Sequence, residues 1–210
     1  MKIVIFGPPG AGKGTQEEAI MKRLSIPAIS TGDILRDAIN KKTPLGLSAK
    51  KQMDSGDLVP DDIILGIVID RISKKDCEGG YILDGVPRTI GQAISLDERG
   101  IKPDVVLSLV VADEEIITRL GGRRACPNCR ATFHIVSKPP SSEGICDICD
   151  TGLITRKDDD PETIRHRLVE YHKETEPLIE YYRSQGIFKP VANAPGIAET
   201  TKEVFKVLGI

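Results

Sequence analysis

Residues 1–16 read MKIVIFGPPGAGKGTQ, in which a short apolar run leads into a glycine-rich turn. The β-branched run at 2–6 is too short for a helix and indicates a buried strand. From Gly7 to Lys13 the chain keeps the spacing of a phosphate-binding loop, and the residues that follow are typical of a helix. Glycines let backbone N–H groups turn toward one anion, the helix N-terminus adds its positive end, and the lysine supplies a point charge. The stretch therefore predicts a strand, a loop for nucleotide phosphates and a helix.

One residue departs from the usual form of this loop. The position after the lysine normally carries a hydroxyl that binds magnesium, but here it is Gly14, and Thr15 comes one place late. A glycine-rich turn with a chance lysine is the structural alternative. The strand before the loop and the helix after it argue against that alternative, so the meaning of Gly14 depends on the rest of the chain.

The composition of the 210 residues is ordinary for a globular protein, with 40% hydrophobic and 29% charged residues. A formal net charge of −2 argues against a general nucleic-acid binder, because such proteins are usually strongly basic. No apolar run approaches the roughly 18 residues that a membrane helix needs. The IVIF run at 3–6 leads straight into glycines, which favours a strand over a signal peptide. We therefore expect a cytoplasmic protein without a membrane partner.

Short apolar runs alternate with helical patterns along most of the chain. Besides 2–6, the runs typical of strands are 27–30, 81–84, 105–111 and 188–193. The helical patterns cover 13–24, 61–74, 89–99, 113–120, 161–174, 176–185 and 197–208. Asp160 and Pro161 predict a helix start, and Pro177 predicts a division of 161–185 into two helices. The alternation predicts an α/β fold in which helices cover both faces of a parallel sheet.

Two segments interrupt this alternation. Residues 30–59 contain helical patterns but no convincing strand after Ser30, which indicates a helical insertion. Residues 122–159 carry four paired cysteines and little helical periodicity. Both segments follow strand or helix ends of the core, where the ligand-binding loops of open α/β sheets gather. The predicted core then consists of residues 1–29, 60–121 and 160–210.

The cysteines predict a metal site. Cys126 and Cys129 form one C-x2-C pair, Cys146 and Cys149 form another, and sixteen residues separate the pairs. This spacing is typical of zinc sites with four thiolates, which leave no position for water, so the predicted metal is structural. A redox pair is the alternative, and the presence of two matched pairs favours zinc. Cys77 stands alone and is interpreted as a small buried apolar residue.

A nucleic-acid-binding zinc ribbon is a second interpretation of this segment. Residues 122–157 hold six Lys and Arg against three acidic residues, and one aromatic ring. A single aromatic is a weak platform for stacking bases. The segment is therefore interpreted first as a structural zinc site and only second as a nucleic-acid module.

Three motifs together resemble the adenylate kinases, a family of nucleoside monophosphate kinases with the P-loop fold. They are GPPGAGKGTQ at 7–16, STGDILR at 30–36 and DGVPRTIGQA at 84–93, and the resemblance covers essentially the whole chain. It implies a three-layer fold with a five-stranded parallel sheet, a helical AMP-binding insertion at 30–59 and a zinc-ribbon-like lid at 122–159. In this family magnesium is held largely through water and the nucleotide phosphates, so a hydroxyl directly after Lys13 is not required. The implied activity is the reversible reaction ATP + AMP = 2 ADP by a monomer, with Mg²⁺ and a structural Zn²⁺.

The resemblance also assigns residues to the two nucleotides and the metals. The residues implied for ATP are Gly10, Ala11, Gly12, Lys13, Gly14, Thr15, Arg119, Arg123, Thr132, Phe133 and Pro195. Those implied for AMP are Thr31, Arg36, Asp57, Leu58, Val59, Gly85, Val86, Pro87, Arg88, Gln92, Arg156 and Arg167. The implied catalytic residues are Lys13, Arg88, Arg123, Arg156 and Arg167. Asp84 is implied for the water shell of magnesium, and Cys126, Cys129, Cys146 and Cys149 for zinc.

Phosphoryl transfer to AMP needs cations more than a general base, because the acceptor phosphate is already ionised near pH 7. The cost lies in bringing two polyanions together and in excluding water. Arginine suits this task because its planar fork binds two oxygens at once. The three histidines belong to no recognisable acid–base motif. A solvated surface role is the alternative for any single arginine and is preferred for Arg124, Arg130 and Arg165.

Other interpretations stay open at the level of sequence. UMP/CMP kinases resemble this chain but usually read SAG in place of STG and carry Asn near Gln92, so Thr31 and Gln92 favour AMP. A regulatory nucleotide switch would share the phosphate loop, but the nearest string to its Asn-Lys-x-Asp motif starts at Asn40 and lacks the Asp. Asp84 and Asp33 also have structural alternatives, as a turn former and as part of a helix cap.

Overall fold

A parallel five-stranded sheet forms the centre of the computed structural model, which describes residues 1–194 and 196–210. The strand order is β2-β3-β1-β4-β7. The strands are β1 (Lys2–Phe6), β2 (Ala28–Ser30), β3 (Tyr81–Asp84), β4 (Val105–Val110) and β7 (Phe188–Ala192). All five predicted runs are confirmed as strands, although three of them are one residue shorter than predicted. The ATP contact expected of Pro195 lies outside the described residues.

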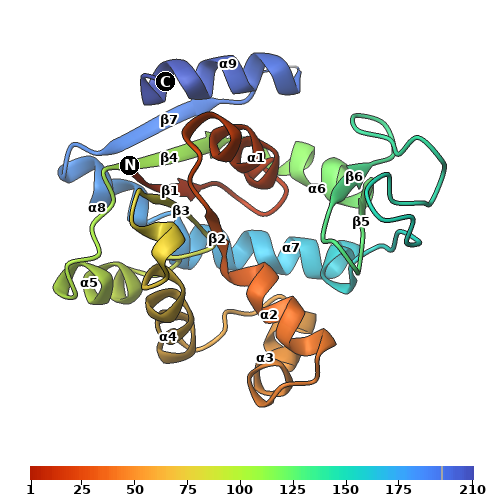
Figure 1. Ribbon diagram of the computed structural model, residues 1–210, viewed down its shortest axis with the longest axis horizontal. Coiled ribbons are helices and arrows are strands. Elements are labelled where there is room, and N and C mark those ends of the chain that lie inside the picture. The colour runs from red at the N-terminus through yellow and green to blue at the C-terminus, as the bar shows by residue number, and fades with distance from the viewer. Residues whose placement is uncertain (195) are drawn as a thin grey trace.

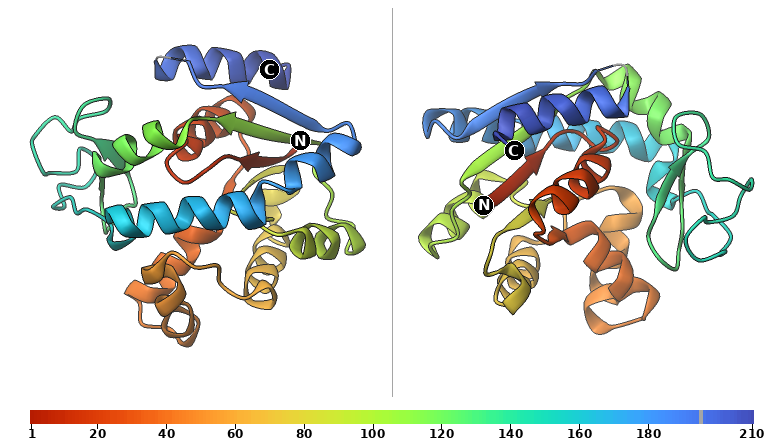
Figure 2. Two further views of the ribbon diagram at one scale, coloured as in Figure 1. Left: turned by 180° about the vertical axis from the view of Figure 1, so that it is seen from behind. Right: turned by 45° about the horizontal axis from the view of Figure 1, so that its top comes forward.

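Helices cover both faces of this sheet, as Figures 1 and 2 show. Ile3 and Ile5 of β1 pack in a cluster with side chains of α1 and α9, while Val4 and Phe6 pack with α4, α5 and α8. This alternation follows from the two-residue period of a strand. The helices are α1 (Lys13–Leu24), α2 (Thr31–Asn40), α3 (Pro44–Ser55), α4 (Asp61–Ile72), α5 (Ile90–Glu98), α6 (Asp113–Gly121), α7 (Pro161–Glu170), α8 (Leu178–Ser184) and α9 (Ile197–Leu208). The predicted α/β fold is confirmed.

The long C-terminal helical stretch contains a feature that the sequence pattern does not reveal. Asp160 caps α7 by accepting a hydrogen bond from the Glu162 amide at 3.0 Å, and Pro161 occupies the first turn, as predicted. The helix then widens into a π-helical turn at Tyr171–Thr175, before the predicted break at Pro177. A π turn keeps the polar and apolar composition of an α-helix, so the predicted helix at 161–174 is too long at its end.

The insertion at 30–59 consists of α2 and α3, which lie together at the bottom of Figure 1. Ser30 caps α2 by accepting a hydrogen bond from the Asp33 amide at 3.3 Å. Buried side chains of the insertion, Leu35 and Ala49, belong to the same apolar cluster as Val4 and Phe6 of the sheet. The insertion therefore shares the core of the sheet.

Residues 122–159, here called the lid, have a core of their own. The antiparallel strands β5 (Arg123–Ala125) and β6 (Thr132–His134) form a separate two-stranded sheet. Cys126, Phe133 and Cys146 are buried together beneath it. Between Arg123 and Arg156, where the structure describes every residue, there is no α-helix. A short 3₁₀ turn at Lys157–Asp159 leads back to α7.

Two smaller expectations can also be compared with the fold. Cys77 is buried with 4% exposure, as expected of an apolar residue, and lies in a 3₁₀ turn at Lys75–Cys77. Among the described residues no helix is both long and apolar enough to cross a membrane.

Candidate active site

The phosphate loop connects β1 to α1 through backbone conformations that favour glycine. Gly10 has φ 83°, and a Cβ atom built on it would lie 2.7 Å from Leu120 Cγ. Gly12, with φ 95°, is the left-handed N-cap of α1 and provides no side-chain acceptor. The first N–H groups of α1 are thus left to bind an anion, which is the arrangement expected for nucleotide phosphates.

Lys13 lies across the mouth of this loop. Its Nζ donates hydrogen bonds to the backbone oxygens of Gly7 at 2.8 Å and Pro8 at 3.0 Å. Burial lowers the pKa of this lysine, and the charge of nearby Asp84 acts in the opposite direction. A lysine ammonium beside a glycine-rich loop is the arrangement that binds the β- and γ-phosphates of a nucleotide.

Asp84 ends β3 and lies beside β1, where it pairs in register with Ile5. Its Oδ2 lies 3.4 Å from the Ser30 hydroxyl. Its Oδ1 is buried and has no hydrogen-bond partner among the described residues. A buried carboxylate oxygen with a free lone pair fits a group that accepts hydrogen bonds from metal-bound water, as predicted for magnesium.

Arg88 follows β3 on a loop that several contacts fix. Its Nε donates to the Gly85 oxygen at 3.0 Å, and its backbone oxygen accepts from the Thr175 hydroxyl at 2.9 Å. The Val86–Pro87 peptide before it is cis. Burial lowers the pKa of Arg88, and the charge of Asp84 counteracts this effect. The guanidinium is thus held in position at the carboxyl end of the sheet.

Three further arginines meet at the base of the lid. Arg123 pairs with Asp159, with Nε 2.8 Å from Oδ2, and Arg167 Nη1 lies 3.0 Å from Asp158 Oδ2. Burial lowers the pKa of both Arg156 and Arg167 to about 10, so both remain cations at neutral pH. The structure thus brings cations from the core and the lid to one place.

The charge of Asp158 responds to this cluster. Burial alone raises its pKa, but the guanidinium groups of Arg167, Arg123, Arg36 and Arg156 outweigh burial and lower it. Asp158 is therefore an anion at neutral pH, and its ion pair with Arg167 holds the 3₁₀ turn at Lys157–Asp159 against α7.

Three of the predicted acceptor residues, Thr31, Arg36 and Gln92, contact other parts of the protein. Arg36 Nη2 pairs with Asp33 Oδ1 at 2.5 Å, and the Thr31 hydroxyl donates to the Gly85 oxygen at 3.1 Å. Gln92 is 2% exposed, and its Nε2 donates to Asp61 Oδ1 at 2.6 Å. Its Oε1 accepts from the amide of Arg88 at 2.7 Å. Because both ends of the Gln92 amide hold the protein together, its contact with adenine stays a prediction.

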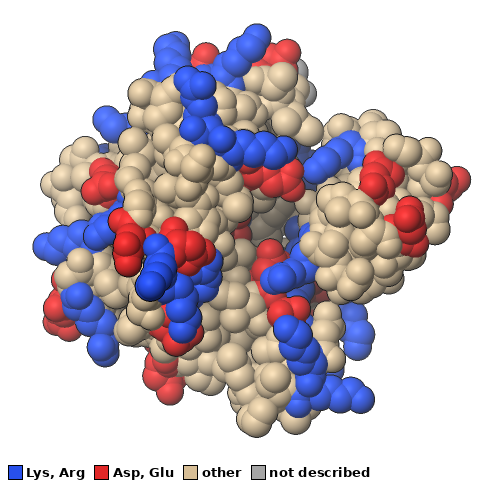
Figure 3. Space-filling model, viewed as in Figure 1, with Lys and Arg blue, Asp and Glu red and all other residues tan. Residues whose placement is uncertain are grey.

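A cavity of about 80 Å³, open to solvent, lies between the phosphate loop and the loop after β3. Its lining includes Lys13 of the phosphate loop together with Gly85 and Arg88 from the loop after β3. Leu58 and Arg167 complete the wall from the segment after α3 and from α7. Figure 3 shows charged side chains along the hollow between the lid and the rest of the molecule. The cavity is therefore the candidate active site.

The other predicted contacts of ATP lie apart from this cavity. Arg119 Nη2 pairs with Glu115 Oε1 at 2.5 Å, one turn earlier on α6. Thr132 lies on β6 opposite Ala125, and Phe133 is buried in the core of the lid with 6% exposure. Stacking of Phe133 on adenine stays a prediction, since its ring contacts the lid core.

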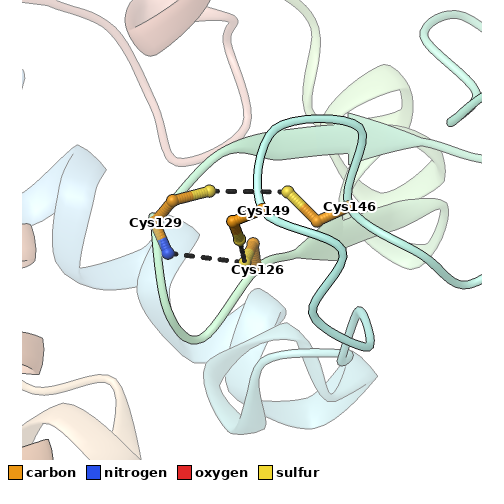
Figure 4. A group of neighbouring side chains, drawn as sticks. All are labelled: Cys126, Cys129, Cys146 and Cys149. Atoms are coloured by element: carbon orange, nitrogen blue, oxygen red, sulfur yellow. Dashed lines mark hydrogen bonds between the residues drawn. The ribbon is translucent and has the colours of Figure 1, made fainter.

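The four paired cysteines converge in the lid, as Figure 4 shows. Their sulfur atoms all lie within 4.8 Å of one another, and the Cys126–Cys149 and Cys129–Cys146 sulfur pairs are each 3.4 Å apart. Four thiolates around zinc lie about 3.8 Å apart, given Zn–S bonds of about 2.3 Å. Hydrogen bonding by Thr151 lowers the pKa of the Cys149 thiol to about 6, whereas burial and the neighbouring thiols raise the pKa of Cys129 to about 12. The cluster fits a structural zinc ion.

A sequence profile described as adenylate kinase matches residues 5–187. The chain is 52% identical over 214 residues to an adenylate kinase of Caldicellulosiruptor bescii, with all of both chains covered. It is 50% identical over 213 residues to one of Clostridium botulinum, with 100% of this chain and 99% of the relative covered. The chain belongs to the adenylate kinase family. A further adenylate kinase, from Ruminiclostridium cellulolyticum, is 50% identical over 214 residues with both chains fully covered.

Membership of the adenylate kinase family decides between the open interpretations. The chain is a nucleoside monophosphate kinase, and the reaction of the family is ATP + AMP = 2 ADP. The match covers both the phosphate loop and the four cysteines, so neither a nucleotide switch nor a nucleic-acid ribbon explains the chain. Gly14 thus belongs to the phosphate loop of an adenylate kinase.

Two residues beside the adenylate kinase motifs were missed by the sequence analysis. Thr175 reaches the Arg88 backbone from the π turn, and no sequence motif predicts that turn. Glu17 is buried beside Lys13 and Asp84, and burial together with the Asp84 charge raises its pKa. The sequence could have revealed Glu17 through its four-residue spacing from Lys13, because this spacing places both residues on one face of α1.

Proposed function

We propose that this adenylate kinase transfers the phosphoryl group within the cavity where the cations of the core, the insertion and the lid meet. The single observation that supports this proposal is that Lys13, Arg88 and Arg167 line one cavity although they come from distant parts of the chain. The charges of Arg36, Arg123 and Arg156 act on the same cluster.

The proposed donor site binds ATP phosphates on the backbone of residues 10–15 and on Lys13. Arg119, Thr132, Phe133 and Pro195 are proposed to hold the rest of ATP. The proposed acceptor site uses Arg36, Arg88, Arg156 and Arg167 for the AMP phosphate. The adenine and ribose of AMP are proposed to contact Thr31, Asp57, Leu58, Val59, Gly85, Val86, Pro87 and Gln92.

The residues of the cavity perform the reaction by placing charge. Arginine forks neutralise the oxygens of the transferred group and of the acceptor, which would otherwise repel each other. The lid and the insertion exclude water, which would otherwise accept the phosphoryl group. No side chain has to remove a proton, since the acceptor phosphate is already an anion.

Two metal ions belong to the proposal. Mg²⁺ bound to the nucleotide neutralises phosphate charge, and Asp84 is proposed to hold its water through the buried Oδ1. Zn²⁺ is proposed for Cys126, Cys129, Cys146 and Cys149, where it would hold the lid together. The converging sulfur atoms support this assignment.

We assign three parts to the chain: a core at 1–29, 60–121 and 160–210, an AMP-binding insertion at 30–59, and the lid at 122–159. The separate core of the lid supports its movement as a unit. Its proposed hinges are Gly121–Gly122 at the end of α6 and Arg156–Lys157 at the start of the 3₁₀ turn.

The protein is proposed to act as a monomer in the cytoplasm, on small-molecule nucleotides alone. One chain supplies all the cations of the cavity, so the site needs no second copy. Its proposed substrates are metabolites of the cytoplasm.

The test is ADP formation from MgATP with AMP, UMP, CMP or GMP as the sole acceptor. AMP should support turnover far better than the other three nucleotides. A preference for a pyrimidine would contradict the assignments of Thr31 and Gln92, while leaving the phosphate site intact. Failure with every acceptor would overturn the proposed site.

A further inference from the structure

Glu17 is a buried carboxylate at the edge of the phosphate loop. It lies on α1 four residues after Lys13 and three after Gly14, so the three residues share one face of the helix. Only 6% of Glu17 is exposed, although the neighbouring Glu18 is exposed. A carboxylate is rarely buried without a partner, because its desolvation is costly.

The surroundings of Glu17 are mostly acidic. Its carboxyl is close enough to Asp84 to share a hydrogen bond, and the charge of Asp33 also acts on it. Glu17 Oε1 and Asp84 Oδ1 are both buried without a hydrogen-bond partner in the described part of the chain. Two neighbouring carboxyl groups, each with a buried oxygen that has no partner, are an arrangement that a shared cation would satisfy.

Lys13 does not fill this role. Its Nζ donates to the backbone oxygens of Gly7 and Pro8, and no ion pair within 4.0 Å joins it to Glu17 among the described residues. The charge of Lys13 acts on Glu17 less strongly than the charge of Asp84 does. A shared proton or a second cation is therefore needed where the two carboxyl groups meet.

Gly14 leaves space for a hydrated ion. A Cβ atom built on Gly14 would have no neighbour within 4 Å in the described part of the chain. A hydroxyl at this position would normally reach the metal directly. Magnesium loses its water reluctantly and keeps several water molecules when it binds a nucleotide, so open space beside the loop suits it.

We propose that Glu17 acts with Asp84 to hold the water shell of the nucleotide-bound Mg²⁺, in place of the hydroxyl that Gly14 lacks. This inference rests on the proposed function, in which Asp84 serves the metal. Glu17 is then a positioning residue, which reaches the metal through water. Outer-shell partners of this kind typically change metal affinity by about 10-fold or more when they are replaced.

A structural role predicts a different outcome. A protonated Glu17 could donate a hydrogen bond to Asp84 and serve the packing of α1 alone. Glu17→Gln keeps a donor of the same size in that position, so a structural role predicts unchanged metal binding. The substitution removes the acidic group that, on the proposal, gives up its proton when the hydrated metal is bound.

The experiment measures Mn²⁺ binding to the full-length protein in complex with a non-hydrolysable ATP analogue, from the electron paramagnetic resonance signal of free Mn²⁺. Competition with Mg²⁺ then gives the affinity for magnesium. Glu17→Gln should weaken the binding of both ions by about 10-fold, and Glu17→Asp should weaken it less. Glu18→Gln is the matched control, because it makes the same change at the exposed neighbour and should leave metal binding unchanged.

Three outcomes would overturn the inference. They are unchanged metal affinity in Glu17→Gln, equal weakening in Glu18→Gln, and a lower melting temperature of Glu17→Gln without any change in metal affinity. If Glu17→Gln fails to fold, the Glu17→Asp affinity decides, and an unchanged value again overturns the inference. Turnover of the unsubstituted protein with MgATP and AMP tests the proposed function separately. Turnover without a role for Glu17 in metal binding would overturn only this inference, and absence of turnover would overturn the proposed function.

Discussion

Single residues in this protein are held by contacts that motifs do not specify. The motif predicts Lys13 and Arg88, and the structure shows what fixes them, namely the loop carbonyls for Lys13 and Gly85 with Thr175 for Arg88. Gln92 illustrates the limit of such predictions. A nucleotide-reading amide and a structural amide have the same sequence, and here both ends of the amide are bonded to Asp61 and Arg88.

Replacement of Lys13 tests whether its charge is needed for phosphoryl transfer at the phosphate loop. Lys13→Met keeps the length of the side chain but removes the charge that faces the β- and γ-phosphates. Turnover with MgATP and AMP should fall by about 100-fold or more, the loss typical of removing one group that stabilises transition-state charge.

The control for this replacement is Lys22→Met, which makes the same change at an exposed position on the same helix. It should leave turnover and the unfolding transition unchanged. Near-normal turnover of Lys13→Met in a steady-state assay would contradict the role of the lysine.

The observed strands and helices agree closely with the predicted ones where the pattern of buried apolar residues determines the secondary structure. Both faces of the parallel sheet are covered, so its central strands β3, β1 and β4 read as largely apolar runs, whereas the edge strand β7 has exposed Lys189 and Pro190. All five strands were predicted. The π turn at Tyr171–Thr175 was not predicted, because a turn with one extra residue has the same kind of amino-acid composition as the α-helix around it. The burial of Glu17 was also missed, since it depends on β3 and Asp84, more than sixty residues away in the sequence.

A histidine connects the π turn to the start of α6. His172 Nδ1 lies 2.8 Å from Glu176 Oε2, and its Nε2 lies 3.0 Å from Asp113 Oδ2. Hydrogen bonds to Glu176 and then to Asp113 raise the pKa of His172 above 6.5. Its contribution to stability is fully present below pH 6.5 and is lost as the pH rises through the raised folded pKa.

His172→Gln should remove this dependence on pH. Urea unfolding at several values between about pH 6 and pH 8 would give the free energy of unfolding of both proteins. The difference between them should shrink as the pH rises. A difference that is constant across this range would show that the imidazolium does not join the two elements.

The insertion and the lid differ in how they are connected to the apolar core of the whole molecule. The insertion at 30–59 shares the core of the sheet through Leu35 and Ala49, whereas the lid has a separate core of cysteines and Phe133. Composition and spacing predicted the lid because the paired cysteines are a local signal. The shared core of the insertion depends on contacts across the fold, which no local pattern contains.

Removal of the metal tests whether the lid is ordered separately from the rest of the molecule. A strong chelator should unfold the lid at a temperature below the transition of the rest of the molecule, because structural zinc contributes about 10–16 kcal/mol to the ordering of such a segment. Hydrogen exchange at 122–159 should rise first, while exchange in β1 and β4 stays slow. A metal-free protein with unchanged melting and unchanged exchange in the lid would refute the structural role.

The separate core of the lid also bears on how such a protein can be altered. A segment whose apolar core is its own can be exchanged for a segment of another design, provided that its two ends stay close together and its ion pairs with the core, such as Asp158 with Arg167, are kept. A chimaera could therefore receive a lid without cysteines and keep its sheet intact. The insertion at 30–59 does not allow such grafting, because its removal would strip apolar side chains from the face of the sheet itself.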